Sequence, residues 1–320
     1  MPPKNAQNQP AARKAIAPSA SIAPRAHTGL RTPPPTVSGR WLLAAAALSV
    51  VAAAFCAWGA LCLLFWQGSW QLLYHPKSAI TSTPASVGLA FDPVAFATTE
   101  AAEQRLKGWW IPAEPGAHYS GYTVLYLHGQ DGNLSDSIGT LSALHQVGLN
   151  VFAFDYRGYG QSQFQRPSEA RWREDADWAL QYLTGTRHVA ADTIVLYGID
   201  LGANLALEIA AAHPELAGVV IESPLEEPMS AIFNDPRAHM VPAHLLVRDR
   251  FNARAAATRL KIPSLWIYQA RNPPPALNPK PYQVATAPRM VIWQYEPGDE
   301  KASLARWLDD LNPGSHSPRN

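Results

Sequence analysis

The chemistry that this chain could perform centres on Asp200, in the stretch Gly198-Ile199-Asp200-Leu201-Gly202. A β-branched and aromatic run, residues 193–197, precedes this stretch, and an Ala- and Leu-rich segment follows it. The pattern predicts a strand, a tight turn and a helix, with the Asp200 side chain at the apex of the turn. We expect the glycines there because side chains beside such a turn would collide with neighbouring backbone. A carboxylate in this position could attack an alkyl carbon and form an ester.

The elements that must position Asp200 alternate along the chain. We expect strands at residues 91–99, 105–113, 123–128, 151–155, 193–197, 218–221, 264–270 and 290–295, and helices at 135–146, 168–183, 201–212 and 301–311. The first two strands are expected to form an antiparallel pair. The alternation predicts an α/β fold with a mainly parallel sheet and helices on both faces. Residues 225–262 contain several prolines and irregular helical patches, which favour a small lid.

The first 70 residues have a different composition. Residues 1–40 are rich in Pro, Ala and Ser and lack hydrophobic periodicity, so we expect them to be disordered. Residues 41–66 carry no charge, and at 1.5 Å per residue a helix there would be about 39 Å long, enough to cross the membrane with some tilt. A cleaved signal peptide is the alternative, but the run is too long for one. The sequence therefore predicts one transmembrane helix, and so a membrane partner through residues 41–66.

Charge and cysteine content exclude several classes of function. The chain has 26 basic and 25 acidic residues, which gives no field for nucleic acid. Six of the basic residues lie in residues 1–40, where there is no acidic residue, which predicts a cytoplasmic N-terminus and an extracytoplasmic remainder. Cys56 and Cys62 both lie inside the apolar run, so a disulfide framework, a Cys-based metal site or a Cys nucleophile is excluded elsewhere. We expect neither a cofactor nor a metal.

Several motifs, in order around the Asp200 turn, resemble the α/β-hydrolases. They are Gln71-Leu72-Leu73-Tyr74-His75-Pro76, Gly108-Trp109-Trp110-Ile111-Pro112-Ala113, Leu127-His128-Gly129-Gln130-Asp131-Gly132-Asn133, Phe154-Asp155-Tyr156-Arg157-Gly158-Tyr159-Gly160-Gln161-Ser162 and Ile221-Glu222-Ser223-Pro224. The resemblance covers residues 70–311 and is to the membrane-anchored branch related to serine esterases, thioesterases and serine aminopeptidases. It implies an α/β-hydrolase domain at 70–311, with residues 312–320 as a flexible tail.

The resemblance also implies a catalytic set, and this chain has lost it. The family's Ser, Asp and His positions are occupied by Asp200, Asn272 and Asp299. The family's oxyanion hole would be formed by the backbone N–H groups of Gln130 and Leu201, which survive side-chain exchange. We therefore expect a fold without ordinary serine-hydrolase activity, that is, a pseudoenzyme. A scaffolding or binding role with a pocket for a small acyl or peptide ligand fits this expectation.

Three alternatives stay open. Epoxide hydrolases and haloalkane dehalogenases use an Asp at this turn, so Asp200 could be an active nucleophile on ester, epoxide or halide substrates. Glu222 would then replace the missing acid, and His239, His244 or His316 would supply the base. Alternatively, Asp200 and Asp299 could face each other and share a proton or a cation.

A pocket that serves only partner contacts is the third alternative. We assign His128, Asp155 and Arg157 structural roles in the loops around the turn.

Overall fold

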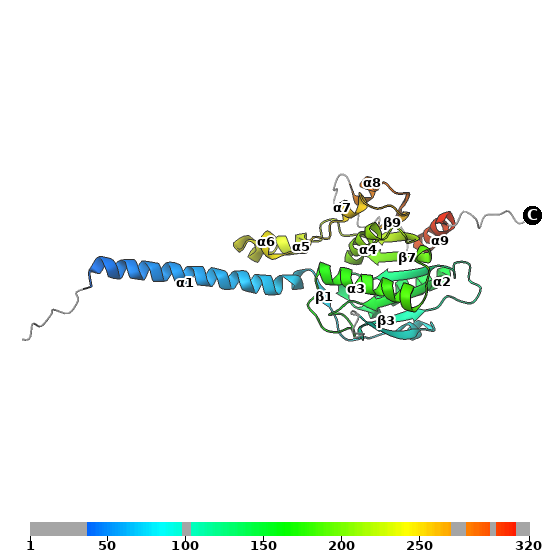
Figure 1. Cartoon of the computed structure of the whole chain (residues 1–320), viewed down its shortest axis with the longest axis horizontal. Helices are drawn as coiled ribbons and strands as arrows, with labels where there is room; N and C mark the ends of the chain where they lie inside the picture. The colour runs from blue at the N-terminus through cyan, green and yellow to red at the C-terminus, as the bar shows by residue number, and fades with distance from the viewer. Residues whose placement is uncertain (1–36, 98–103, 270–279, 295–298, 312–320) are drawn as a thin grey trace, which may run out of the picture. The chain divides into compact units, whose positions relative to one another are not determined.

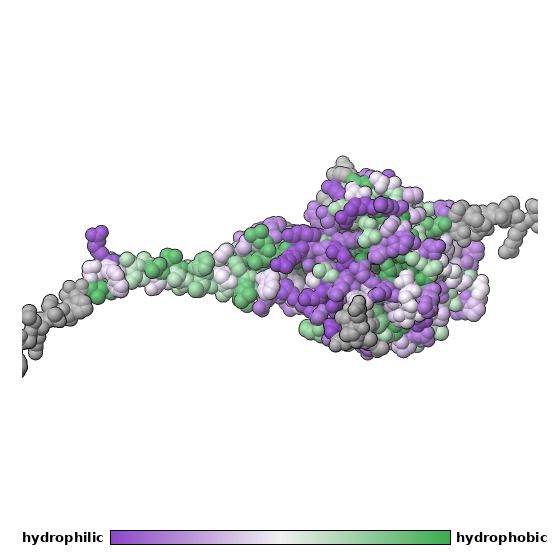
Figure 2. Space-filling view, in the orientation of Figure 1, coloured by the Kyte–Doolittle hydropathy of each residue, from purple (hydrophilic) through white to green (hydrophobic). Residues whose placement is uncertain are grey.

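The computed structural model describes residues 37–97, 104–269, 280–294 and 299–311 of the chain. It contains two compact units, residues 1–53 and 54–320. Helix α1 (Gly39–Gly68) begins two residues before the predicted apolar run and ends two residues after it. This helix is long and apolar enough to cross a membrane. Its exposed surface is largely hydrophobic, whereas hydrophilic residues cover much of the visible face of the larger unit (Figure 2).

An eight-stranded sheet forms the centre of the larger unit (Figure 1), with strand order β10-β9-β8-β7-β4-β6-β3-β2. Its strands are β2 (Asp92–Ala97), β3 (Gln104–Ile111), β4 (Thr123–Leu127), β6 (Asn150–Asp155), β7 (Ile194–Ile199), β8 (Gly218–Glu222), β9 (Ser264–Gln269) and β10 (Arg289–Gln294). β2 pairs antiparallel with β3, and β3 antiparallel with β6, whereas β6, β4, β7, β8, β9 and β10 are mutually parallel. The predicted strands and the mainly parallel sheet are confirmed.

The helices also follow the sequence pattern. They are α2 (Ile138–Val147), α3 (Glu169–Gln181), α4 (Leu201–Ala212), α5 (Ser230–Phe233), α6 (Ala243–Leu246), α7 (Ala253–Ala257), α8 (Pro281–Val284) and α9 (Asp299–Leu311). The short 3₁₀ helices are η1 (Ser69–Leu72), η2 (Pro84–Val87), η3 (Leu134–Ser137), η5 (Ala191–Thr193) and η6 (Pro236–Met240), and η4 (Tyr182–Thr186) is a π-helix. The predicted lid, residues 225–262, stays a prediction; within it, α7 buries Ala253, Ala256 and Ala257 in the same core cluster as α4. We use the name lid segment for residues 229–248 from here on.

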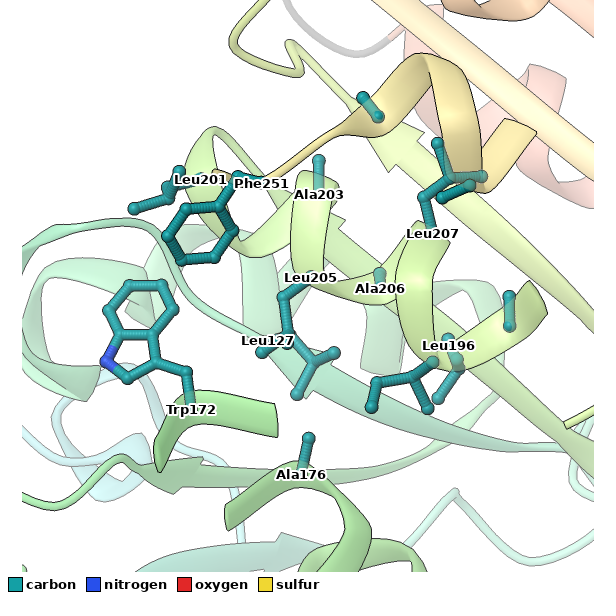
Figure 3. Close-up of a cluster of buried hydrophobic side chains, with 14 of the residues drawn as sticks. Leu127, Trp172, Ala176, Leu196, Leu201, Ala203, Leu205, Ala206, Leu207 and Phe251 are labelled. Atoms are coloured by element: carbon teal, nitrogen blue, oxygen red, sulfur yellow. The ribbon is translucent and has the colours of Figure 1, made fainter. Parts of the chain in front are cut away.

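The two faces of the sheet bury two separate cores, because side chains alternate along each strand. On β4, for example, Leu125 and Leu127 belong to one core, while Val124 and Tyr126 belong to the other. The first core packs α3, α4 and α7 on the sheet, with α4 at its centre (Figure 3). The second core packs α2 and α9 on the opposite face. Helices on both faces were the sequence expectation, and the structure confirms it.

A second, two-stranded sheet was not predicted. β1 (His75–Pro76) pairs in parallel with β5 (Asp131–Gly132), and each strand has only two residues. Strands so short leave no periodic pattern in the sequence. The pairing attaches the chain that follows α1 to the loop after β4, close to the Asp200 turn.

Candidate functional site

The Asp200 turn has the strained geometry that the sequence predicts. Asp200 lies between β7 and α4 with φ 52° and ψ −122°, a conformation that costs a non-glycine residue about 1–3 kcal/mol. A Cβ at position 198 would lie 2.3 Å from the Gly202 carbonyl oxygen. A Cβ at position 202 would lie 2.3 Å from the carbonyl oxygens of both Leu127 and His128. Both glycines are therefore required by close backbone approach.

The carboxyl group of Asp200 lies against the loop that follows β4. A Cβ added at Gly129 would lie 3.2 Å from Asp200 Oδ2, and the Asp200 backbone N–H donates to the Glu222 carbonyl oxygen at 3.0 Å. Burial and, to a smaller extent, the nearby charge of Asp131 raise the pKa of Asp200 to about 6. At neutral pH the group is close to its titration range, where it can both hold and release a proton.

We expect Asp200→Asn to stabilise the protein at pH 8 but not at pH 4. The pKa of Asp200 is higher in the folded protein than in the unfolded chain, where it is about 4. The protonated side chain therefore contributes its full stability below about pH 4. That contribution is lost as the pH rises through about 6. Removing the charge should therefore recover about 1–2 kcal/mol at pH 8, a figure reduced for the partial exposure of the group.

The measurement for this expectation is thermal unfolding of the full chain in detergent at both pH values. Asp310→Asn, which changes an exposed carboxyl on α9, is the control and should leave both curves unchanged. An equal gain for Asp200→Asn at both pH values would contradict the assignment.

The two residues expected to supply oxyanion-hole donors are neighbours. The Leu201 backbone N–H donates to Gln130 Oε1 at 3.2 Å, so this donor already has an acceptor from the protein. The Gln130 carbonyl oxygen accepts from the His75 backbone N–H and from the Tyr159 hydroxyl, which hold the Gln130 backbone in place. A substrate oxygen could bind Leu201 N–H only after the Gln130 side chain moved away.

The positions that replace the acid and the His of the family are only partly described. Asn272 lies outside the described residues. Asp299 is the first residue of α9, but its side chain is not described. Because β7 to β10 are parallel, their carboxyl ends lie at one edge of the sheet, the edge that carries Asp200. Contact between Asp200 and Asp299 stays a prediction.

Glu222 ends β8 next to the turn and binds a tyrosine. Glu222 Oε2 accepts a hydrogen bond from the Tyr197 hydroxyl at 2.5 Å. Burial raises the pKa of Glu222, and the charges of Glu300 and Asp200 add to the shift. Glu222, Tyr197 and Glu300 line a cavity of about 260 Å³ between α2 and α9. The raised pKa favours the protonated form of Glu222. Glu222 forms no hydrogen bond with a histidine among the described residues, so it does not act there as the acid that orients a catalytic base.

The histidines expected as candidate bases do not contact Asp200 where the structure describes them. His239 lies in η6, and His244 lies in α6 with its ring 4.1 Å from that of Phe233. Neither forms a hydrogen bond with Asp200 in the described part of the chain. His316 lies outside the described residues.

His75 is the imidazole that sequence reasoning missed. His75 Nδ1 lies 2.6 Å from Asp131 Oδ1, and both side chains are exposed. His75 and Gln130 line a cavity of about 350 Å³ together with apolar side chains, including Leu72 and Leu225. His75 belongs to the motif at residues 71–76, but it is far from Asp200 in sequence. Only the pairing of β1 with β5 brings it to the loop that follows β4.

The structural roles expected of His128, Asp155 and Arg157 are confirmed. The His128 ring is buried, with Nδ1 2.8 Å from the Gly129 carbonyl oxygen, and burial lowers its pKa to about 4. Asp155 accepts from the Leu134 backbone N–H at 2.9 Å. Arg157 forms a buried ion pair with Asp175. These groups hold the loops around the turn, and His128 is neutral at pH 7.

Comparison with known proteins gives a family match and several relatives. Residues 122–294 match the family model described as alpha/beta hydrolase fold. The chain is 35% identical over 178 residues to an uncharacterized protein of Mycobacterium tuberculosis, covering 56% of this chain and 61% of that protein. It is 32% identical over 143 residues to the human alpha/beta hydrolase domain-containing protein 17C, covering 44% of this chain and 42% of that protein. The matched region thus spans less than two thirds of these relatives.

Solved structures with the same fold are more distant in sequence. The Pyrococcus furiosus esterase Pf2001 superposes with a TM-score of 0.57 at 19% identity, covering 75% of this chain and 97% of the esterase. An alpha-beta hydrolase from Vibrio vulnificus superposes with a TM-score of 0.52 at 19% identity, covering 72% of this chain and 82% of that protein. At this level of identity the similarity shows the fold alone.

Proposed function

The chain belongs to the alpha/beta hydrolase fold family, and from that premise we propose that it is a membrane-anchored member without ordinary serine-hydrolase turnover. Its role would be to bind a small acyl or peptide group, or to act as a scaffold. The observation that carries this proposal is the state of the turn, where Asp200 replaces the alcohol and Gln130 Oε1 accepts from the Leu201 N–H.

Each change at the site removes a large part of the catalytic power of such a fold. Losing a general base costs about 10²–10⁴-fold in rate. Losing one oxyanion-hole donor costs about 10²–10³-fold. Asp200 also lacks the hydroxyl through which an acyl-serine would form. The remaining feature that fits a ligand is the cavity beside Gln130, since its volume of about 350 Å³ is within the range of small-molecule sites.

Membrane anchoring through α1 is part of the same proposal. Helix α1 has the length and composition of a membrane span. The six basic residues within residues 1–40 favour a cytoplasmic N-terminus, and the hydrolase-fold domain would then lie on the extracytoplasmic side.

A second candidate function is hydrolysis with Asp200 as the nucleophile. The pair of His75 and Asp131 favours it, because an imidazole hydrogen-bonded to a carboxylate can activate water. In this reaction Asp200 would displace a leaving group from carbon and form an ester. Water would then attack the ester carbonyl, leaving one solvent oxygen in the Asp200 carboxyl group.

Fluorophosphonate labelling tests the proposal, because the probe reacts only with an activated nucleophile such as a catalytic serine. We expect neither the full-length wild type nor Asp200→Ser to be labelled, since a serine at position 200 would still lack a base. An active serine esterase is the positive control. Labelling of the wild type would refute the proposal.

Mass spectrometry of the Asp200 peptide after incubation with epoxide, halide and ester substrates in H₂¹⁸O decides the second candidate. We expect no ¹⁸O in the Asp200 carboxyl group. Incorporation that depends on substrate, and that is lost in His75→Gln, would establish Asp200 as a nucleophile instead.

A further inference from the structure

A cavity lies where the end of α1 meets the lid segment. It has a volume of about 360 Å³ and is lined by side chains from α1, η1, the loop before α3, α3 itself and residues 232–249. Its polar wall contains Arg166, Arg171, Arg248 and Asp249, and Trp66 and Trp70 form the adjoining aromatic wall. It is separate from the cavity beside Gln130, with which it shares no lining residue.

The cavity has an excess of positive charge. Arg166 Nη2 donates to the Trp66 carbonyl oxygen at 2.7 Å, and Arg171 Nη1 donates to the Arg166 carbonyl oxygen at 2.8 Å. Within the part of the chain that the structure describes, Arg166, Arg171 and Arg248 form no ion pair with a carboxylate. Asp249 is the one acidic lining residue, and its carboxylate accepts from the Tyr74 hydroxyl at 2.7 Å.

Burial of the guanidinium lowers the pKa of Arg166; the charge of Asp249 opposes this shift and the charge of Arg171 adds to it. Three arginine side chains therefore line the cavity with a single carboxylate, that of Asp249, and several of their N–H groups have no acceptor among the described residues. An anion with several oxygen acceptors would satisfy them, and guanidinium groups match phosphate oxygens in geometry.

The position along α1 indicates where that anion would come from. Trp41 and Trp66 are 25 residues apart in sequence, which is about 38 Å along a helix. A bilayer with its headgroup regions is roughly 40–45 Å thick, so both tryptophans would lie near the headgroup layers. The Arg166 guanidinium lies 5.7 Å from the centre of the Trp66 ring, and so at the same level.

The lid segment reaches further along α1. Trp58 Nε1 donates to the Met240 carbonyl oxygen at 3.1 Å, and Trp58 is eight residues, about 12 Å, before Trp66. Met240 and Leu245 are 61% and 82% exposed, beside exposed His239 and His244. Exposed apolar side chains mixed with polar and basic ones are typical of the membrane interface. Ile232, Leu246 and Val247 add an apolar wall to the cavity.

We propose that this cavity binds the phosphate of an anionic phospholipid headgroup, with Arg166, Arg171 and Arg248 as the phosphate-binding side chains. The inference rests on the proposed anchoring of α1 in the membrane. The lipid glycerol and first methylenes would lie against Ile232, Leu246 and Val247, which is a contact that free phosphate cannot make. The lid segment would thereby be fixed to the membrane surface.

Native mass spectrometry of the purified full chain in detergent tests the proposal. The chain is titrated separately with dihexanoyl phosphatidylglycerol, dihexanoyl phosphatidylcholine and inorganic phosphate. We expect one phosphatidylglycerol to bind, at least about tenfold more tightly than either other probe. Arg248→Gln should weaken this binding about tenfold, since it removes one charge-assisted contact. Arg237→Gln, an exposed lid arginine outside the cavity, is the matched control and should bind as the wild type does.

The variants keep the proposal falsifiable. Arg248 has no hydrogen-bond or ion-pair partner among the described residues, so its loss should leave the melting temperature unchanged even if Arg166→Gln fails to fold. Binding unchanged in Arg248→Gln would overturn the proposal. Equal binding of phosphatidylcholine, or of inorganic phosphate, would overturn the anionic lipid as the ligand. Extraction of the wild-type chain from membranes by alkaline carbonate would refute the anchoring instead, whereas a retained chain without lipid preference refutes only this inference.

Discussion

Gly202→Ala is expected to destabilise the hydrolase-fold domain by about 3–5 kcal/mol. The added Cβ would lie 2.3 Å from two backbone carbonyl oxygens, those of Leu127 and His128, at the end of β4. Backbone atoms in the centre of a sheet cannot rotate away as a flexible side chain can, so α4 would have to move from the sheet. α4 buries nine of its twelve residues, and its displacement would break the core around it.

Thermal unfolding of the full chain in detergent, followed by tryptophan fluorescence, measures this effect. Gly139→Ala is the matched control, because Gly139 also lies in the first turn of a helix but has no atom within 4 Å of an added Cβ. That variant should be neutral or more stable by up to about 1 kcal/mol. Equal melting temperatures for Gly202→Ala and the wild type would mean that α4 and β4 are not in such close contact.

Asp175→Ala is expected to destabilise the same domain by about 3–5 kcal/mol. Asp175 is fully buried on α3 and accepts from Arg157 Nε at 2.5 Å and from the Arg157 backbone N–H at 2.8 Å. Its removal would leave the buried Nε–H and the backbone N–H of Arg157 without their acceptors. Arg157 is the second residue after β6, so the loss would also loosen the loop that carries Tyr159 toward Gln130.

Glu174→Ala provides the comparison for the same arginine. Glu174 accepts from Arg157 Nη2 at 2.5 Å, but its side chain is about half exposed, so its loss should cost less than about 1 kcal/mol. Melting temperatures of the two variants in detergent give the test, and Asp175→Ala should melt about 10 °C lower. Equal effects of the two substitutions would show that burial does not separate these two partners.

Most of the fold could be predicted from the sequence because its signals are local. The buried strands of a parallel sheet are short apolar runs, and β4, β6, β7 and β8 each have one. The turn could be predicted as well, since glycines at 198 and 202 beside an apolar helix satisfy a steric condition that the structure confirms. The pairing of β1 with β5 could not be predicted, because two-residue strands have no period to recognise.

The sequence could predict that Asp200 lies at a turn between a strand and a helix, but not the interactions around this turn. The sequence by itself determined the family, the α/β architecture, an apolar N-terminal helix, and an acid at the turn between β7 and α4. Only the tertiary structure decided that Gln130 Oε1 faces the Leu201 N–H, that His75 pairs with Asp131, and that the arginines at 166, 171 and 248 line one cavity. The physical reason is range. Strand and helix formation depends on side-chain patterns over a few residues, whereas these contacts join segments 56 to 82 residues apart and exist only after the sheet has assembled.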